Sequence, residues 1–499
     1  ECGSGFRGVA SPNGSGVRGM TIRVIGTNYD GVDADVDGDI WFLADERVLS
    51  TRSGKGNAFD FLSTSGGQLV VAGHVISHEA VGIASDAGSR ENTVYVGASG
   101  VVKGFRNAIE LNGGLHSITN LGEVHGGIKL IGDNGEISNG GVVEEGRIRL
   151  VGDLGVIYND GLASRGITST GESNDVTNLG EVRGGIRLIG DNGQILNGGE
   201  IRRSEVGVAI EGNSNTFVND GYMETDLLGL SVAGTDNELT NRDRITGGTI
   251  GVEFATVDGE TNTLTNSGII RTENDLGPAV VGGDGDEVIV NTFIIFGEVL
   301  LNGGNDVYDG RDAYLPQWEY DEYGETLWTY PNPGTVDGGL GDDDLTGTRY
   351  RDTLLGGGGD DIIRGARGSD HLQGGSGYDV LIGGVGSDTI EGNGGNDRLA
   401  GRAGDDILTG GKGADTFVFG TSYNIRSSAD DKDRITDFED GTDKIDLSKF
   451  GTDFSAVADA IDGNMQGDAR ISLYQLGGEG IIIVEGTSSA QLDASDFIL

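Results

Sequence analysis

Cysteine, proline and basic residues are scarce in this chain. The 499 residues include a single cysteine, Cys2, and five prolines, so no internal disulfide can hold the fold together. Lysine and arginine number 34 against 80 aspartates and glutamates, which gives a formal net charge of −46. That charge excludes general binding to nucleic-acid phosphates. It also makes the chain repel itself until cations neutralise it, so we expect bound cations to stabilise the fold.

Long apolar runs and catalytic motifs are also missing. No stretch approaches the about 18 apolar residues that a membrane-spanning helix requires. The sequence contains no HExxH, no GxSxG and no phosphate-binding P-loop, and its five histidines show no metal-ligand spacing. Carboxylates are so numerous that choosing a catalytic pair among them would be arbitrary. These absences favour a protein that is not an enzyme.

Glycine, by contrast, is abundant, and much of it lies in nine consecutive nonapeptides that occupy Gly338–Val418. The sixth residue of each nonapeptide is Asp and the eighth is large and apolar. Glycines let a tight loop turn its carbonyl oxygens inward, and carbonyl and carboxylate oxygens are the ligands that Ca²⁺ prefers. We therefore predict Ca²⁺ as the cofactor. The predicted metal ligands are Asp343, Asp352, Asp361, Asp370, Asp379, Asp388, Asp397, Asp406 and Asp415.

The pattern is the GGxGxDxUx repeat, and it resembles the RTX (repeat-in-toxin) family of secreted proteins. Only the second nonapeptide, GTRYRDTLL, has lost most of its glycines. The resemblance implies a parallel β-roll with two repeats per turn, in which alternate loops stack on one edge and ions lie between them. One column would hold Asp343, Asp361, Asp379, Asp397 and Asp415, and the other would hold Asp352, Asp370, Asp388 and Asp406.

A second, longer repeat runs from about residue 70 to residue 295, with Asn-x-Gly as its punctuation. The anchors are Asn120, Asn139, Asn159, Asn178, Asn197, Asn219, Asn241, Asn266 and Asn291. A period near 20 with short alternating strands predicts a solenoid, and the Asn column should form a hydrogen-bonded ladder. This region is similar to the parallel β-helices of bacterial secreted proteins. We predict an all-β fold in which a parallel β-helix continues into an RTX parallel β-roll.

Five parts follow from these boundaries: an N-terminal arm (1–20), the β-helix (21–300), a transition with an aromatic insertion (301–337), the calcium β-roll (338–418) and a C-terminal cap with secretion signal (419–499). Residues 433–450 resemble the segment that closes RTX rolls in serralysin-like proteases. The last four residues, Asp-Phe-Ile-Leu, look like an uncleaved type I secretion signal. The resemblance implies a bacterial protein exported by a type I system to the cell surface or beyond.

Two features could serve recognition. Strand alternation places Lys129, Arg149 and Arg187 outward at equivalent positions, so they would stack as a basic stripe on an acidic rod. The stripe could bind a polyanion such as a uronate polysaccharide, or its bases could simply pair with acids on adjacent rungs. The insertion Arg311–Gly334 holds Trp318 and Trp328 among several tyrosines. It could cover a seam of the core or project as a contact loop.

Two functions from different classes remain open. The first is a secreted calcium-binding structural or adhesive protein that self-assembles at the cell surface as a layer, fibre or matrix. The second is an extracellular lyase or epimerase acting on a polyuronate, because a β-helix followed by an RTX module is also the arrangement in bacterial mannuronan C5-epimerases. The Asp-Pro-His-Glu signature of those enzymes is absent. The sequence favours the first function.

Overall fold

The computed structural model describes residues 22–25, 32–34, 39–44, 47–50, 57–62, 64–257, 259–273, 277–313, 335–420, 431–463, 467–478 and 480–499. The predicted N-terminal arm (1–20), together with Trp318 and Trp328 of the predicted contact loop, lies outside the described residues. None of the helices in the described ranges is long and apolar enough to cross a membrane.

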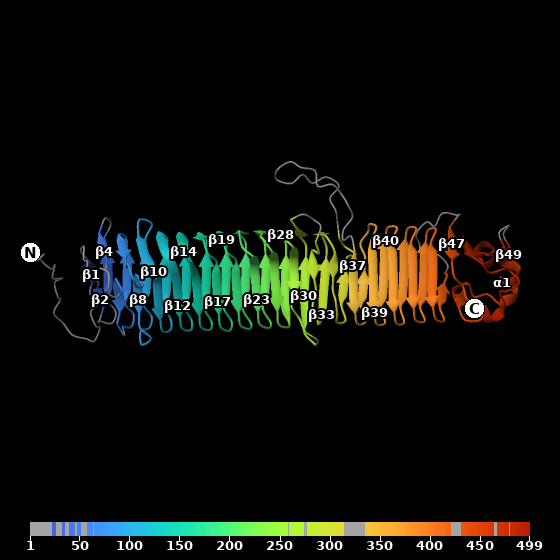
Figure 1. The fold of residues 1–499 in the computed structure, drawn as a ribbon, viewed down its shortest axis with the longest axis horizontal. Helices are drawn as coiled ribbons and strands as arrows, with labels where there is room; N and C mark the ends of the chain where they lie inside the picture. Colours follow the sequence, from blue (N-terminus) through green and yellow to red (C-terminus); the bar gives the residue numbers. More distant parts are fainter. Residues whose placement is uncertain are drawn as a thin grey trace, which may run out of the picture.

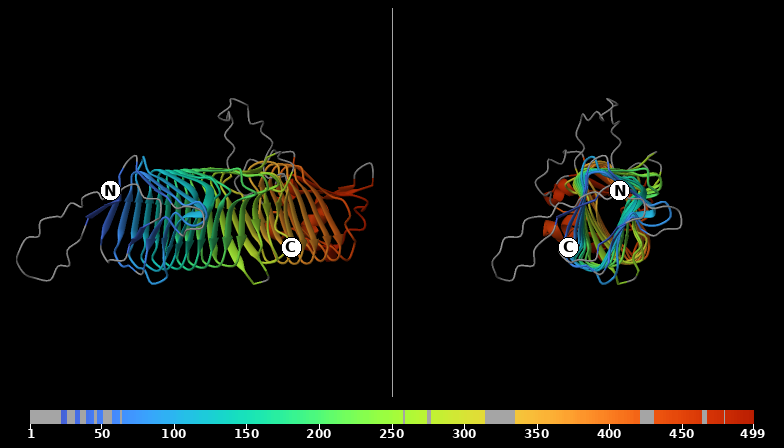
Figure 2. Two further views of the ribbon diagram at one scale, coloured as in Figure 1. Left: turned by 60° about the vertical axis from the view of Figure 1, so that its left-hand side comes forward. Right: turned by 90° about the vertical axis from the view of Figure 1, so that its left-hand side faces the viewer.

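The described chain winds into one elongated solenoid (Figure 1). Its strands run across the rod, and the view along the rod shows successive rungs superposed (Figure 2). Short strands with buried apolar residues at every second position cannot shield themselves, so each rung covers the apolar edge of the next one. The predicted parallel β-solenoid is confirmed, with the β-helix continuing into the β-roll along one axis.

One side of the rod, face A, is a parallel sheet of 21 strands. Its β-helix part consists of β1 (Ile22–Ile25), β3 (Ile40–Leu43), β6 (Gln68–Val71), β9 (Thr93–Val96), β11 (Ser117–Asn120), β13 (Glu136–Asn139), β15 (Val156–Asn159), β18 (Asp175–Asn178), β21 (Gln194–Asn197), β24 (Thr216–Asn219), β27 (Asn237–Asn241), β30 (Thr261–Asn266) and β33 (Asp286–Asn291). Its remaining strands are β36 (Val307–Asp309), β38 (Asp344–Thr346), β40 (Ile362–Arg367), β42 (Val380–Val385), β44 (Arg398–Ala403), β46 (Thr416–Val418), β48 (Lys444–Asp446) and β52 (Phe497–Ile498).

A second parallel ladder, face B, also runs the length of the rod. It comprises β2 (Val32–Ala34), β5 (Phe59–Phe61), β8 (Ile83–Ser85), β10 (Val101–Asn112), β12 (Glu123–Ile131), β14 (Val142–Val151), β17 (Ile167–Thr170), β20 (Ile186–Ile189), β23 (Val206–Glu211), β26 (Leu228–Ala233), β29 (Ile250–Phe254), β32 (Val280–Val281), β35 (Val299–Leu300), β37 (Val336–Leu340), β39 (Thr353–Gly358), β41 (His371–Ser376), β43 (Thr389–Gly394), β45 (Ile407–Lys412), β47 (Lys432–Ile435) and β51 (Ile481–Val484).

A third ladder, face C, is confined to the β-helix. The first halves of β10, β12 and β14 belong to it, together with β4 (Val48–Ser50), β7 (His74–Ile76), β16 (Leu162–Ala163), β19 (Glu181–Arg183), β22 (Glu200–Arg202), β25 (Tyr222–Glu224), β28 (Arg244–Gly247), β31 (Ile269–Thr272) and β34 (Ile294–Phe296). Within the described residues this ladder ends at β34. The solenoid therefore changes from three faces per turn to two, which explains why the repeat shortens to 18 residues.

The interior combines apolar columns with an amide ladder. The eighth residue of every nonapeptide is fully buried. In the β-helix, each anchor Asn from Asn120 to Asn266 donates its Nδ2 proton to Oδ1 of the next anchor, at 2.7 or 2.8 Å. The ladder ends where Asn291 Nδ2 donates to the Tyr308 hydroxyl at 3.4 Å. The predicted Asn ladder is therefore present, and it satisfies polar groups that would otherwise be buried without partners.

The C-terminal residues add further rungs and then close the stack. Strands β48 and β52 extend face A, and β47 and β51 extend face B. Strands β49 (Ile461–Gly463) and β50 (Ala469–Ser472) are antiparallel, and β50 also pairs antiparallel with β51. The short helix α1 (Phe454–Ala460) packs here, and the 3-10 turns are η1 (Ser448–Phe450), η2 (Leu473–Leu476) and η3 (Ala494–Asp496). Antiparallel pairing ends the parallel repeat and covers an edge that could otherwise pair with another chain.

Candidate calcium sites

The aspartates of the nonapeptides form two columns along the β-roll. Asp343, Asp361, Asp379 and Asp397 each donate a backbone N–H to Oδ1 of the aspartate 18 residues later, at 2.8 or 2.9 Å. The same bond joins Asp352, Asp370, Asp388 and Asp406 into the second column. The first column leads into the strands of face A and the second into those of face B. The structure thus stacks the predicted aspartates in the order that the repeat length implies.

The loops that hold these carboxylates depend on left-handed backbone angles. The second and fourth residues of the repeat adopt them, as Gly357 (φ 110°) and Gly359 (φ 136°) illustrate. Glycine takes these angles at no steric cost, so the Gly-rich pattern fixes the shape of the loop.

The second oxygen of these carboxylates has no hydrogen-bond partner. Oδ2 is buried and unpaired in Asp343, Asp361, Asp370, Asp379, Asp388, Asp397, Asp406 and Asp415. These side chains are at most 2% exposed. A buried carboxylate oxygen without a partner is strongly unfavourable, so each one calls for a cation or a proton. The unpaired oxygens are the strongest structural indication that the roll holds metal ions.

A carbonyl oxygen from the next turn lies close to each of several such carboxylates. A Cβ atom placed on Gly356 would lie 2.2 Å from Asp361 Oδ2 and 2.6 Å from the Gly374 carbonyl oxygen. At Gly392 the corresponding distances are 2.4 Å to Asp397 Oδ2 and 2.5 Å to the Gly410 carbonyl oxygen. A carboxylate oxygen and a carbonyl oxygen thus lie beside the same glycine Cα, where a larger residue would clash with both. Carboxylate and carbonyl oxygens are the ligands that Ca²⁺ prefers, so the chemistry of these residues fits calcium.

Side chains alone do not complete these sites. Among the described residues, no group of three or more His, Cys, Asp or Glu side chains is placed to hold a metal ion. Backbone carbonyls must supply the remaining ligands. An all-oxygen ligand set of this kind suits a hard cation such as Ca²⁺ and not zinc or copper.

Burial raises the pKa of these carboxyl groups well above the usual range. Desolvation is the largest cause, and neighbouring carboxylates add to it at several of the sites. The raised pKa is about 8 for Asp370; about 7 for Asp343, Asp352, Asp397 and Asp406; and about 6 for Asp361, Asp388 and Asp415. The pKa of Asp379 is raised as well. Without a cation, the folded roll would therefore bind a proton most readily at Asp370, and the sites with a pKa of about 6 would protonate only as the pH falls below neutral.

Asp352 differs from the other eight aspartates. Its repeat carries Thr348 at the second position, where the other eight repeats have a residue with positive φ. Thr348 donates its backbone N–H to Asp352 Oδ2 at 2.7 Å and lies within hydrogen-bond distance of the same oxygen through its hydroxyl at 3.0 Å. Protein donors therefore satisfy this carboxylate. A metal ion at Asp352 stays a prediction, and it has less support than the others.

Three aspartates outside the nonapeptides extend the columns. Asp306 donates its N–H to Asp343 Oδ1 at 2.7 Å and has an unpaired, buried Oδ2 of its own. At the other end, Asp443 accepts from the N–H of Asp415 at 2.9 Å, and Asp433 accepts from the N–H of Asp406 at 3.2 Å. All three were absent from the predicted ligands. In the sequence, each of these aspartates begins a triplet of Asp, any residue and a buried Tyr or Ile. The residues around these triplets lack the full glycine pattern of the nonapeptides.

The predicted basic stripe lies on face B. Lys129, Arg149, Thr168 and Arg187 occupy paired positions on successive rungs. Lys129 forms an ion pair with Glu110 at 2.9 Å, and Arg187 pairs with Glu211 at 2.6 Å. Both acids lie on neighbouring strands, so carboxylates neutralise two of the three bases. This arrangement agrees with the alternative in which the stripe pairs with adjacent rungs.

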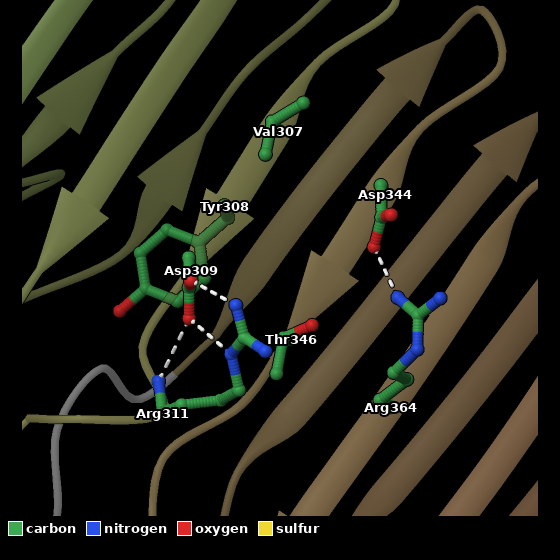
Figure 3. Close-up of a pocket in the computed structure, with 7 residues that line it drawn as sticks. All are labelled: Val307, Tyr308, Asp309, Arg311, Asp344, Thr346 and Arg364. Carbon is green, nitrogen blue, oxygen red and sulfur yellow. Dashed lines mark hydrogen bonds and ion pairs between the residues drawn. The ribbon is translucent and has the colours of Figure 1, made fainter.

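A small pocket of about 280 Å³ opens on face A where the β-helix meets the β-roll (Figure 3). Its two guanidinium groups are paired: Arg311 with Asp309 at 2.5 Å, and Arg364 with Asp344. Val307, Tyr308 and Thr346 complete the lining. Each arginine of the pocket is therefore paired with an aspartate of its wall. The lining contains neither histidine nor cysteine, so the pocket adds no support for catalysis.

Comparison with known proteins finds matches to part of this chain. Residues 254–476 match the family model described as Peptidase M10 serralysin C terminal. Among solved structures, the solution structure of the AlgE6R3 subunit from the Azotobacter vinelandii mannuronan C5-epimerase is 29% identical to this chain. The match covers 34% of this chain and 86% of that one, with a TM-score of 0.19. No curated protein sequence matches significantly. Residues 254–476 thus form a C-terminal segment of the serralysin type with RTX repeats, so the chain contains an RTX-type calcium-binding β-roll and is secreted by a type I route to the extracellular space.

Proposed function

We propose that this protein is a structural or adhesive component that self-assembles at the cell surface as part of a layer, fibre or matrix. The observation that carries the proposal is the continuous rod, in which face A alone contains 21 strands in parallel register. A protein built from stacked rungs offers long repetitive sides and two ends, which suits assembly. The paired charges of the pocket and of the stripe give no comparable support to catalysis.

Calcium would act as the folding switch. The unpaired carboxylates and the glycine carbonyls of the roll would hold the ions, which supply the positive charge that the buried oxygens need. A site that the unfolded chain lacks turns metal binding into folding free energy. Inside a cell, where free Ca²⁺ is scarce, residues 338–418 would stay unfolded and exportable. Outside, at about 10⁻³ M Ca²⁺, they would fold.

The two ends of the rod would differ in assembly. The C-terminal end is closed by antiparallel strands, as described above. The first rungs, which include β1, β3 and β5, would offer a docking surface, and the aromatic insertion with Trp318 and Trp328 would add a lateral contact. Repulsion between rods of net charge −46 would make calcium bridges necessary as well.

Sedimentation of the full chain tests this function. In millimolar Ca²⁺ we expect species larger than one chain, and in chelator we expect expanded single chains, because both folding and bridging are lost. A rod that stays monomeric in millimolar Ca²⁺ at high protein concentration contradicts the proposal.

A second candidate is an extracellular lyase or epimerase acting on a polyuronate. The observation that favours it is the register of Lys129, Arg149 and Arg187 on face B, since a stacked row of bases could follow a polyanionic chain. Incubation with alginate and pectin, followed by ultraviolet absorbance of unsaturated products and by the ratio of sugar epimers, tests it. Turnover with either polymer would favour the enzyme.

A further inference from the structure

One outward column of face A carries no charge over 12 consecutive rungs. Adjacent strands pair these residues in direct register from β3 to β33. We call them the neutral column: Phe42, Val70, Tyr95, Thr119, Ser138, Tyr158, Thr177, Leu196, Val218, Thr240, Thr265 and Val290. The column ends at the next rung, where Val290 pairs with Asp309. In a chain with 114 charged residues among 499, an uncharged row of this length needs an explanation.

Large apolar side chains of this column are exposed. Phe42, Tyr95, Tyr158 and Leu196 are 36–38% exposed, although each lies in the middle of a regular strand. These four residues alternate with smaller uncharged ones, among them Val70, Thr119 and Thr177, so the column is a continuous uncharged surface with large apolar side chains at intervals. Exposed apolar surface of this extent is typical of an interaction site. The neighbouring outward column adds only three charges over these strands, Glu136, Asp175 and Glu238, and no base.

The other long face of the rod shows what an ordinary solvent-facing column looks like. On face B, one column in register contains Glu110, Lys129, Arg149, Arg187 and Glu253 among its members. Charged side chains there pair across rungs, as Lys129 does with Glu110. Face B therefore shows that a solvent-exposed column on this rod can be charged. Exposure alone does not explain why the column on face A is neutral.

We propose that the neutral column is the surface through which a second copy of this chain docks, face A against face A. This inference rests on the proposed self-assembly and adds a side-to-side contact on face A to the first rungs and the aromatic insertion proposed above. Charge identifies the occupant: two rods at −46 each repel, and within the β-helix this face lets them approach with few like charges in contact. Stacked sheets pack about 10 Å apart, close to the Debye length of about 8 Å at physiological ionic strength.

The size of the face is sufficient for a stable pair. Twelve strands spaced about 4.8 Å apart and about four residues long give a surface of roughly 50 by 13 Å. Burying it on both copies removes on the order of 1,300 Å² from water, within the range of about 1,200–2,000 Å² for specific complexes. If a two-fold axis passed between the rungs of Tyr158 and Thr177, the two neutral columns would overlap along their whole length, because six members lie on each side of that point.

The experiment places charge at the centre of the column. Tyr158→Lys together with Leu196→Lys adds two cations to the face in the full chain, with millimolar Ca²⁺ present. Lysine lowers the overall repulsion between rods, so any loss of association must come from the contact itself. Each isolated charge is costly to bury, and we expect the dissociation constant from sedimentation to rise at least about tenfold.

A matched control makes the same chemical change elsewhere. Phe105→Lys together with Leu227→Lys replaces two exposed apolar residues on the faces B and C side of the β-helix. We expect this variant to associate like the wild type. Circular dichroism and the Ca²⁺ midpoint of all three proteins should agree, which excludes misfolding as the cause.

The outcomes separate this inference from the proposed function. If the wild type associates and both double variants associate equally well, assembly stands and the neutral column is not the contact. If the wild type is monomeric, assembly itself fails and the inference fails with it. Retention of a monomeric wild type on crystalline cellulose or chitin, lost only in the Tyr158 and Leu196 variant, would assign the face to a carbohydrate and overturn docking of a second copy.

Discussion

At the scale of single residues, the β-roll depends on carboxylates that are buried with one oxygen unpaired. Oδ1 of each interior aspartate accepts a backbone N–H, whereas Oδ2 has no protein partner at eight of the nine positions. Oδ1 therefore holds neighbouring loops together, whereas Oδ2 remains available to bind an ion. Asp352 is the exception, because the backbone N–H and the hydroxyl of Thr348 satisfy its Oδ2.

This contrast provides a paired test of the calcium sites. Asp379→Ala removes a carboxylate with an unpaired oxygen, so we expect fewer bound Ca²⁺ ions by calorimetry and a Ca²⁺ midpoint raised roughly tenfold, equivalent to about 1.4 kcal/mol. Asp352→Ala removes a carboxylate that Thr348 already satisfies, and it should leave the number of bound ions unchanged. Equal loss of calcium in both variants would contradict the assignment.

Acid should compete with calcium. For an aspartate whose folded pKa is raised, the proton stabilises the calcium-free fold fully below the ordinary pKa of about 3.9, and that contribution is lost as pH rises through the folded pKa. Here the raised values lie between about 6 and about 8. As pH falls from 8 to 6, these protons favour a folded calcium-free roll over the unfolded chain, and calcium must then displace them, so we expect the Ca²⁺ midpoint to rise. Calorimetry in buffers of different ionisation heat should show proton release, and a midpoint independent of pH would be inconsistent with this account.

At the scale of elements, the repeat period of the sequence predicts where the strands and rungs lie, but it does not predict individual side-chain contacts. Alternating strands, the Asn anchors and the nonapeptides define the rungs because each pattern repeats a position that must be buried. The end of face C at β34 could not be predicted in the same way, because the rungs shorten gradually there. Pairing of Lys129 with an acid on an adjacent rung was one of the two alternatives, but its partner Glu110 was not predicted, since the choice among several nearby acids depends on side-chain reach. Asp433 and Asp443 were missed because long connections interrupt the period.

The amide ladder should contribute strongly to the stability of the β-helix. Asn178 accepts from Asn159 and donates to Asn197, both at 2.7 Å, in a fully buried position. Asn178→Ala leaves Asn197 Oδ1 without its donor and leaves Asn159 Nδ2 with only the Gly161 carbonyl at 3.2 Å, so we expect a loss of about 1–3 kcal/mol, the cost of one unsatisfied buried group. Thr177→Ala, which alters the adjacent outward residue of the same strand, should change stability by less than about 0.5 kcal/mol. Thermal unfolding at fixed Ca²⁺ compares them, and similar melting temperatures would argue against the ladder.

At the scale of the whole molecule, folding and export place opposite demands on the C-terminal residues. In the folded rod, Asp496 is fully buried and Phe497 is 8% exposed, with its ring 5.8 Å from that of Phe454. The segment that resembles a secretion signal is therefore part of the cap once the chain has folded. A signal that must be read by the export machinery has to be accessible before calcium folds the roll. Scarce calcium inside the cell and abundant calcium outside would impose this order.

Removal of residues 430–499 should therefore keep the protein inside the cell. The truncation deletes the predicted terminal signal, and it also exposes the edges of β45 and β46, which β47 and β48 cover in the intact rod. Open parallel edges pair with other chains, so the retained protein should aggregate if calcium reaches it. Asp379→Ala with Asp397→Ala provides the control, because it weakens the roll but leaves the C-terminal residues intact; this variant should reach the medium in normal amounts. Quantifying each protein in medium and cell pellet decides the matter. Normal secretion of the truncated chain would show that the export signal lies elsewhere, whereas retention of the double variant would show that calcium-driven folding outside the cell is itself needed to complete export.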